Sequence, residues 1–150
     1  MIAYLDTSFL CALYRGQDNT VEAIAHANSM KEPLFVSSLL LFEFRQSIRY
    51  QEFLHKKDSQ KGFDRTTGLA AFAKVQANIA SGAVVIVAAD WTDVHQIAER
   101  LSIQHTHNGG HRGFDILHVA TALHLGAKEF LTFDSNQKKL ARAEGLKIPL

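Results

Sequence analysis

The chain has little of what marks a secreted or membrane-bound protein. Its single cysteine, Cys11, cannot form a disulfide within the chain and is expected to be a small core residue. The longest uncharged stretch, residues 75–89, is shorter than the roughly 18 apolar residues of a membrane-spanning helix. The apolar N-terminus lacks a basic start and is interrupted by Asp6, unlike a signal peptide. We therefore expect a cytoplasmic protein without a membrane partner.

A strong net charge, internal repeats and low-complexity tracts are also missing. The net charge of +1 neither indicates nor excludes a nucleic-acid partner, because a local basic patch is enough to bind one. Hydrophobic residues make up 47% of the chain, which argues against disorder. The length of 150 residues suits one domain, so we expect a single domain over residues 1–150.

Short apolar runs alternate with helical patterns along the chain. Continuous apolar runs of this length predict strands buried on both faces, and hence a parallel sheet. The predicted strands are 2–5, 34–36, 84–87, 130–133 and 146–148. The predicted helices are 8–14, 20–30, 39–55, 68–80, 92–102, 113–125 and 135–143. Ser37 or Ser38 is expected to cap the third helix and Ser135 the last. Residues 104–112 are predicted to form a surface loop. The alternation indicates an α/β sandwich.

Two acidic residues directly follow predicted strands. Asp6 comes after the first strand and Asp134 after the fourth. In an open parallel sheet, ligands bind at the carboxyl ends of the strands, so both side chains would lie at the functional edge. The alternative is that each aspartate only caps the next helix.

Two further acidic residues lie on apolar helices. Glu43 and Asp115 are each surrounded by hydrophobic residues, and a buried carboxylate is costly unless it is paired. Arginines nearby in the sequence offer salt bridges as one explanation. If all four carboxylates met, they could coexist only around divalent cations such as Mg²⁺ or Mn²⁺. Such ions could activate a water and neutralise charge on a phosphodiester. The spacing alone does not show that the four converge.

The segments around these acids resemble the motifs of the PIN-domain family, and within it the VapC-type toxin ribonucleases. The opening motif looks like Asp-x-Ser, with Asp6 and Ser8 in its two defined positions. The later segments are similar to the second, third and fourth acidic motifs: 37–43, 112–122 and 132–137. The resemblance spans essentially the whole chain, in order.

The resemblance implies a PIN-like three-layer sandwich with a parallel five-stranded sheet of order 3-2-1-4-5, so that the first and fourth strands are neighbours. It implies a metal-dependent endoribonuclease that leaves a 3′-hydroxyl and a 5′-phosphate without a covalent enzyme intermediate. Asp6, Glu43 and Asp115 would hold Mg²⁺ or Mn²⁺ directly, and Asp134 directly or through water. Ser8 and Thr132 would orient carboxylates or bound water. No acid of the set is missing.

The same resemblance implies partners. Toxins of this kind are usually homodimers, and an antitoxin's tail blocks the active site. The polar segment 51–67 would serve dimer, antitoxin or RNA contacts. Residues 45–65 contain six basic and three acidic side chains, a local excess that suits RNA phosphates but also fits an ordinary solvated helical pair.

Histidines cluster near the third acidic motif. His105, His107 and His111 suggest zinc, but structural zinc sites commonly include cysteine and none is near. We favour a mobile loop in which His111 or Arg112 faces the substrate. His118 lies one helical turn after Asp115 and could share its face.

Three other readings remain open. Haloacid-dehalogenase phosphatases also place an aspartate after the first strand, but they need a second aspartate where Ser8 stands. A receiver-like domain would need a phosphorylatable aspartate after the third strand, where Asp90 instead resembles a helix cap. The third reading is a non-catalytic PIN-like module that binds RNA or protein. Replacing Asp6 by Asn discriminates it, because a binding module has no cleavage to lose.

Overall fold

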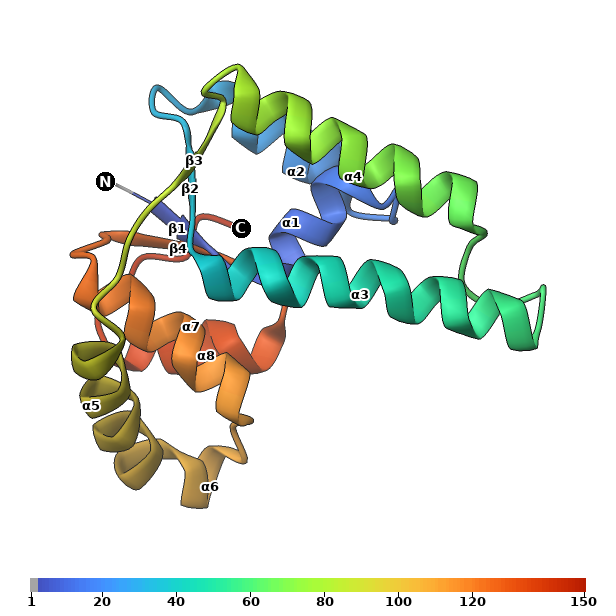
Figure 1. The fold of residues 1–150 in the computed structure, drawn as a ribbon. Coiled ribbons are helices and arrows are strands. Elements are labelled where there is room, and N and C mark those ends of the chain that lie inside the picture. The colour runs from blue at the N-terminus through green and yellow to red at the C-terminus, as the bar shows by residue number, and fades with distance from the viewer. Residues whose placement is uncertain (1–2) are drawn as a thin grey trace. The chain divides into compact units, whose positions relative to one another are not determined.

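Two pairs of parallel strands organise the chain (Figure 1). The computed structural model describes residues 3–150, so Ile2 of the first predicted strand lies outside the described residues. β1 (Ala3–Leu5) pairs with β4 (Glu129–Leu131), and Tyr4 lies opposite Phe130. β2 (Leu34–Val36) pairs with β3 (Val84–Ile86). Both pairings are parallel, as the continuous apolar runs predicted.

The five-stranded sheet expected from the family resemblance is visible only in part. A single parallel bridge joins Glu129 to Lys147, which lies in the predicted fifth strand. The neighbours 1-4-5 and 2-3 of the expected order therefore occur among residues 3–150, as two separate two-stranded sheets and one bridge. The complete order stays a prediction.

All seven predicted helices are present within a few residues of the expected bounds, together with a short helix, α6, that was not predicted. The helices are α1 (Thr7–Tyr14), α2 (Thr20–Ser29), α3 (Ser38–Lys57), α4 (Arg65–Ala80), α5 (Trp91–Leu101), α6 (His107–Gly109), α7 (Gly113–His124) and α8 (Ser135–Ala143). A π-helix, η1 (Ser102–Thr106), separates α5 from α6. The prediction of a loop from residue 104 was therefore wrong, because the helical backbone continues to Gly109. No helix within residues 3–150 is long and apolar enough to cross a bilayer.

One of two compact units comprises the described residues up to Phe9 together with Val87–Leu150. Its core is built around α7, which packs against β1, α5 and α8. The apolar run of α7 supplies Val119, which is fully buried together with Tyr4, Phe130 and Leu101. This core fixes the β1–β4 pair, from whose carboxyl ends Asp6 and Asp134 follow.

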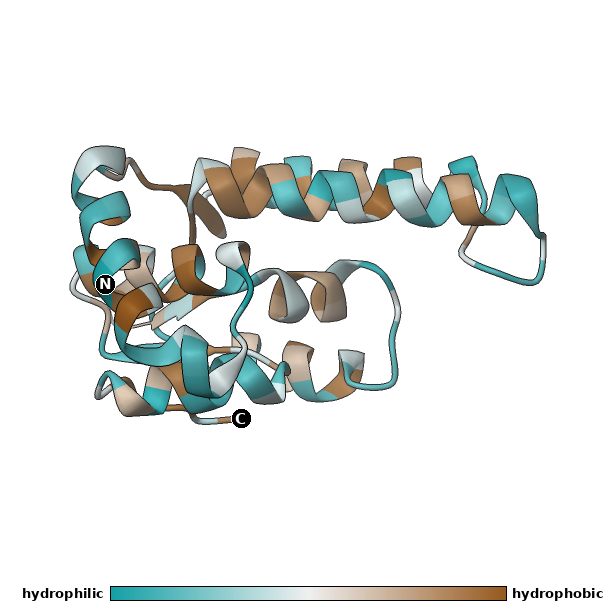
Figure 2. Ribbon diagram, turned by 90° about the horizontal axis from the view of Figure 1, so that it is seen from below, coloured by the Kyte–Doolittle hydropathy of each residue, from teal (hydrophilic) through white to brown (hydrophobic). Residues whose placement is uncertain are grey.

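The other compact unit comprises Leu10–Ile86. Its most extended feature is the antiparallel hairpin of α3 and α4 (Figure 1). Ser37 is the N-cap of α3, accepting a hydrogen bond from the Leu40 N–H. In the turn, Gly62 has φ of +61° and lies against the Gln51 carbonyl, so a side chain there would be both strained and obstructed. The first part of α3 is hydrophobic and its end is polar (Figure 2).

Candidate active site

Asp6 is fully buried at the carboxyl end of β1. Its Oδ1 accepts hydrogen bonds from Ser8 Oγ (2.7 Å) and the Phe9 N–H (3.0 Å). Its Oδ2 accepts hydrogen bonds from Thr132 Oγ1 (2.6 Å) and Gln137 Nε2 (2.8 Å). The bond from Phe9 caps α1, so the capping alternative is true of this aspartate. The other three donors are side chains, two of them from the segment after β4, and a helix cap does not require them.

Opposing effects act on the Asp6 carboxyl group. Burial raises its pKa, because removal from water penalises the charged form. The hydrogen bonds from Thr132, Ser8 and the Phe9 N–H, together with His118, lower the pKa but do not outweigh burial. A carboxylate so enclosed and so fully bonded is held in one orientation.

Asp134 is the N-cap of α8, and its Oδ1 accepts hydrogen bonds from the N–H groups of Asn136 and Gln137, both at 2.8 Å. The prediction that Ser135 caps this helix was therefore wrong, because Asp134 has the extended backbone that precedes the first helical residue. Asp134 is exposed, in contrast to the expectation of an unsolvated carboxylate. Its backbone N–H donates to Thr132 Oγ1 (3.0 Å). Thr132 thus links the Asp134 segment directly to Asp6.

The remaining two acids have different surroundings. Asp115 lies in the first turn of α7 and is half-buried. Asp115 and Asp134 both act electrostatically on His111, so these carboxylates approach the same imidazole. Glu43 lies on α3, in the unit formed by Leu10–Ile86, and is half-buried rather than largely buried. Three of the four predicted acids are therefore in one unit, and Thr132 joins two of them.

The donor set has the chemistry of a site for a hard divalent cation, since it consists of carboxylate oxygens without thiols. Asp134 Oδ2 accepts no hydrogen bond from residues 3–150 and is the most open ligand. Asp6 presents both oxygens already bonded. Over the described chain, no three His, Cys, Asp or Glu side chains are grouped so that they could hold a metal ion. The oxygen ligands are thus of the type that Mg²⁺ prefers, but the described side chains are not grouped around a common point. Coordination by all four carboxylates stays a prediction.

The predicted supporting residues divide into two kinds. The hydroxyl groups of Ser8 and Thr132 both donate to Asp6, and Ser8 Oγ lies 3.2 Å from Thr132 Oγ1. Both hydroxyls therefore restrain the Asp6 carboxylate. His118 is buried, with Nδ1 3.5 Å from the Tyr4 hydroxyl and Nε2 3.3 Å from Thr7 Oγ1. It therefore belongs to the packed wall beside Asp6. Arg112 is exposed at the start of α7.

The predicted histidine loop is rearranged. His111 is buried rather than on the surface, and His105 is paired with Glu144 at 2.7 Å. His107 is exposed. None of the three belongs to a metal-binding group within residues 3–150.

The PIN domain family matches residues 3–143 of the chain. The chain belongs to the PIN domain family. Three solved structures have a similar fold. VapC20 from Mycobacterium tuberculosis is 18% identical with a TM-score of 0.69, and the match covers 97% of this chain and 96% of that chain. FitAcB from Neisseria gonorrhoeae is 17% identical with a TM-score of 0.65 (99% and 96% covered), and VapBC2 from Rickettsia felis is 17% identical with a TM-score of 0.62 (99% and 97% covered). At these identities the likeness shows the fold alone. A search of curated proteins by sequence gave no significant match.

Gln137 is the residue of this PIN domain site that sequence reasoning missed. It lies on the amphipathic helix α8, where a glutamine is usually solvated, but it is 5% exposed and donates to Asp6. Its Oε1 is buried without a hydrogen-bond partner in residues 3–150. Helical spacing is the available signal: Gln137 lies three and four residues before the buried Leu140 and Ala141, and therefore on the same face of α8.

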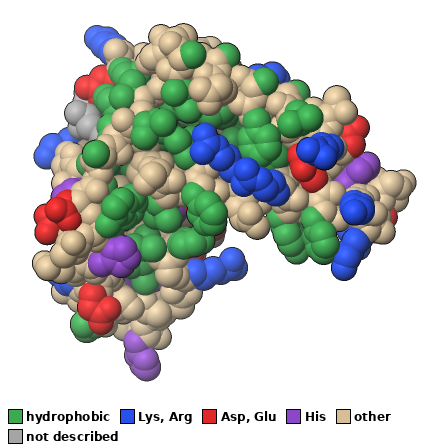
Figure 3. All heavy atoms as spheres, in the orientation of Figure 1, with side chains coloured by type: hydrophobic (Ala, Val, Ile, Leu, Met, Phe, Trp, Pro, Cys, Tyr) green, Lys and Arg blue, Asp and Glu red, His purple; other side chains and the backbone are tan. Residues whose placement is uncertain are grey.

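The α3–α4 hairpin of the PIN domain carries basic and aromatic side chains together. Arg49 lies over the Phe72 ring, 5.5 Å from its centroid, and both line a hollow with Arg45. Further along α3, Lys57 lies 4.7 Å from the centroid of Phe53. Basic side chains lie among hydrophobic ones on this face (Figure 3). Two of the basic side chains within residues 45–65, Arg49 and Lys57, thus lie over aromatic rings.

Proposed function

We propose that this PIN domain protein is an Mg²⁺- or Mn²⁺-dependent endoribonuclease and the toxin of a type II toxin–antitoxin pair. The observation that carries the proposal is the buried Asp6 carboxylate, held by four donors beside the Asp134 segment. Carboxylates buried at such cost are concentrated at functional sites. The similar fold of VapC20, described as a toxin that cleaves the sarcin–ricin loop, supports RNA as the substrate.

In the proposed mechanism Asp6, Asp115 and Asp134 hold the cation, with Glu43 assigned as a further ligand by resemblance. When bound, the cation supplies an activated water and compensates negative charge on the phosphodiester. Ser8 and Thr132 orient Asp6 through its two oxygens, and their hydrogen bonds favour its ionised form against the effect of burial. No side chain forms a covalent intermediate, and the products carry a 3′-hydroxyl and a 5′-phosphate.

Partners follow from the same proposal. An antitoxin protein would inhibit the nuclease. VapBC2, which has a similar fold, is described as bound to a DNA fragment from the promoter. We assign the hairpin of α3 and α4 to contacts with the antitoxin or with a second copy in a homodimer. Its aromatic and arginine side chains, such as Phe72 and Arg49, are of the types enriched in protein interfaces. We place the action of the protein in the cytoplasm.

Cleavage of labelled total RNA tests the nuclease directly. The purified protein is incubated with Mg²⁺ or Mn²⁺, beside an EDTA control and the Asp6→Asn variant. Asp90→Asn is the matched control, because Asp90 caps α5 through the N–H groups of Thr92 and Asp93 and lies outside the acidic site. We expect discrete cuts by the wild type and Asp90→Asn, and none with EDTA or with Asp6→Asn.

The fragment ends would then identify the RNA target. If the wild-type protein, free of any antitoxin, leaves every RNA intact at several metal concentrations, the nuclease proposal fails. The non-catalytic binding module would then be the better description. If Asp90→Asn loses cleavage together with Asp6→Asn, the loss cannot be assigned to the acidic site.

A further inference from the structure

A polar cavity of about 270 Å³ lies beside the histidine segment, within the unit that contains Asp6. η1 contributes His105, α6 contributes Asn108, and α8 contributes Lys139 to its lining. His111, from the segment between α6 and α7, completes the polar part of the wall. The lining side chains named here carry N–H groups and no carboxylate, so the cavity is suited to an anion.

His111 is the unusual member of this lining. It is only 9% exposed, its Nδ1 is fully enclosed, and neither ring nitrogen is hydrogen-bonded within residues 3–150. Buried polar groups are nearly always bonded, so this unbonded imidazole is unusual, and Nε2, which is not among the enclosed atoms, is the nitrogen that a ligand in the cavity can reach. A Cβ on Gly109 would collide with Nε2, so the glycine is what allows the ring to occupy this place.

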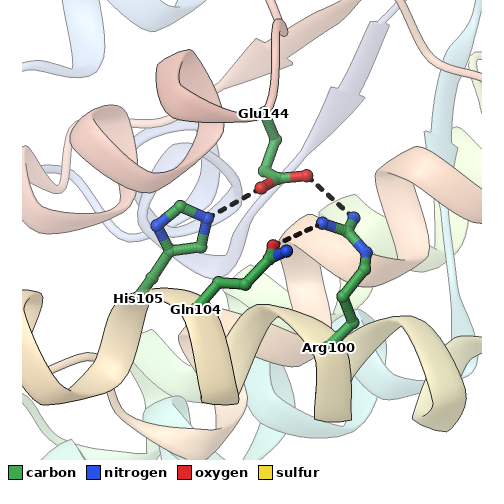
Figure 4. A network of polar contacts seen from close by, with 4 residues as sticks. All are labelled: Arg100, Gln104, His105 and Glu144. Atoms are coloured by element: carbon green, nitrogen blue, oxygen red, sulfur yellow. Dashed lines mark hydrogen bonds and ion pairs between the residues drawn. The ribbon is translucent and has the colours of Figure 1, made fainter.

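Among residues 3–150, the one carboxylate bonded to this lining is already compensated. Glu144 accepts hydrogen bonds from Arg100 Nη2 (2.8 Å) and pairs with His105 Nε2 (2.7 Å), and Arg100 also donates to Gln104 (2.8 Å), as Figure 4 shows. The hydrogen bond from Arg100 lowers the pKa of Glu144, so its charge stays within this network. The network spans the π-helical turn, a geometry that is frequent at functional sites.

Lys139 provides the free positive charge of the cavity. It is exposed and forms neither an ion pair nor a side-chain hydrogen bond within the described chain, yet its charge reaches His111. Burial lowers the pKa of His111, Lys139 lowers it further, and the charges of Asp115 and Asp134 oppose this shift. Lys139 lies on α8, the helix that Asp134 caps, and His111 lies four residues before Asp115, so the cavity is built on the segments that carry two of the candidate metal ligands.

We propose that this cavity binds a phosphate group of the RNA backbone close to the bond that is cut. Lys139 supplies the charge, and His111 and Asn108 supply hydrogen bonds. The proposal rests on RNA being the substrate, and it adds a subsite outside the four carboxylates. It predicts contact with the backbone, which is independent of base sequence.

Binding in an inactive background tests the subsite apart from cleavage. The probe is a fluorescein-labelled single-stranded RNA of eight nucleotides, titrated with Asp6→Asn at several salt concentrations. Lys139→Gln is added to this background, with Lys128→Gln as the matched control. Lys128 is equally an exposed lysine, but it precedes β4 and so lies at the opposite end of that strand from Asp134. Heteronuclear NMR follows the His111 ring during titration with inorganic phosphate.

We expect Lys139→Gln to weaken RNA binding roughly tenfold, as for loss of one charge-assisted contact. The slope of log K against log salt should become shallower by about 0.7, the value for one phosphate on a single strand. Lys128→Gln should change neither the affinity for RNA nor the salt slope. Inorganic phosphate should shift the His111 NMR signals in proteins that keep Lys139 and leave them unmoved in Lys139→Gln.

Equal effects of the two lysine variants, or His111 signals that phosphate leaves unmoved, would overturn the subsite. These outcomes are separate from the cleavage assay. If the wild type cleaves RNA but the two lysine variants bind RNA equally well, only the proposed subsite is refuted. A difference between the variants without any cleavage removes the nuclease and leaves an RNA-binding cavity.

Discussion

Replacing Thr132 by Val should destabilise the protein strongly, although valine has nearly the same shape. The Thr132 hydroxyl is fully buried, donates to Asp6 Oδ2 at 2.6 Å and accepts from the Asp134 N–H at 3.0 Å. A hydrogen bond to a charged group contributes about 1.5–3 kcal/mol, and a neutral one contributes about 1 kcal/mol. We expect the free energy of unfolding to fall by about 3 kcal/mol, because the buried Asp6 loses a donor and the partly buried Asp134 N–H loses its acceptor.

Urea unfolding at pH 7 measures this loss as a shift of the midpoint at unchanged slope. In thermal unfolding, the same loss corresponds to a Tm lower by about 6–12 °C for a chain of this size. Thr121→Val is the matched control. Thr121 is also fully buried, but its hydroxyl donates to the Leu117 carbonyl one helical turn earlier, at 2.7 Å. Its replacement should cost about 1 kcal/mol or less.

Thr132→Ser should retain most of the stability, since it keeps the hydroxyl. If Thr132→Val and Thr121→Val lose the same small amount, the bond to Asp6 does not carry the energy assigned here. If Thr132→Ser is as unstable as Thr132→Val, the lost methyl group rather than the hydroxyl explains the effect.

The pH dependence of stability and the packing at Gly109 give two further tests. Burial raises the pKa of Asp6 above its value in the unfolded chain. The free energy of unfolding therefore falls as the pH rises from about 4, the unfolded-state pKa, through the folded-state pKa, because Asp6 ionises less readily in the folded protein. Metal-free Asp6→Asn should therefore gain stability relative to the wild type from pH 3.5 to 7 in urea unfolding, and a constant or shrinking difference would contradict this sign. Gly109→Ala should displace the His111 ring and cost about 1–3 kcal/mol by thermal unfolding, with altered His111 NMR signals. An unchanged ring signal would show that the loop absorbs the methyl group.

The sequence was informative where local chemistry determines structure. Apolar runs predicted the strands, and the acids that follow them predicted the carboxyl ends where Asp6 and Asp134 lie. The pairing of β1 with β4 followed from the family resemblance and is confirmed. That pairing joins residues far apart in the chain, which a local pattern does not specify.

The rest of the site could not be predicted because tertiary contacts override local preference. Gln137 reads as a solvated helix residue, but the rotation of α8 turns it toward Asp6. His111 lies among glycines and polar residues, which indicates a surface loop, yet the helical turns before it bury the ring. Asp134 was expected to be enclosed, but capping the helix leaves its second oxygen in solvent.

The pairing of β1 with β4 also has a consequence for biosynthesis. Thr132 is added to the growing chain 126 residues after Asp6, which at about 5–20 residues per second takes roughly 6–25 s. During that time the nascent Asp6 has neither Thr132 nor Gln137 to hold it. The site proposed for RNA cleavage is thus absent from the nascent chain until the segment after β4 has been made, and a chain that terminates before that segment never acquires the site.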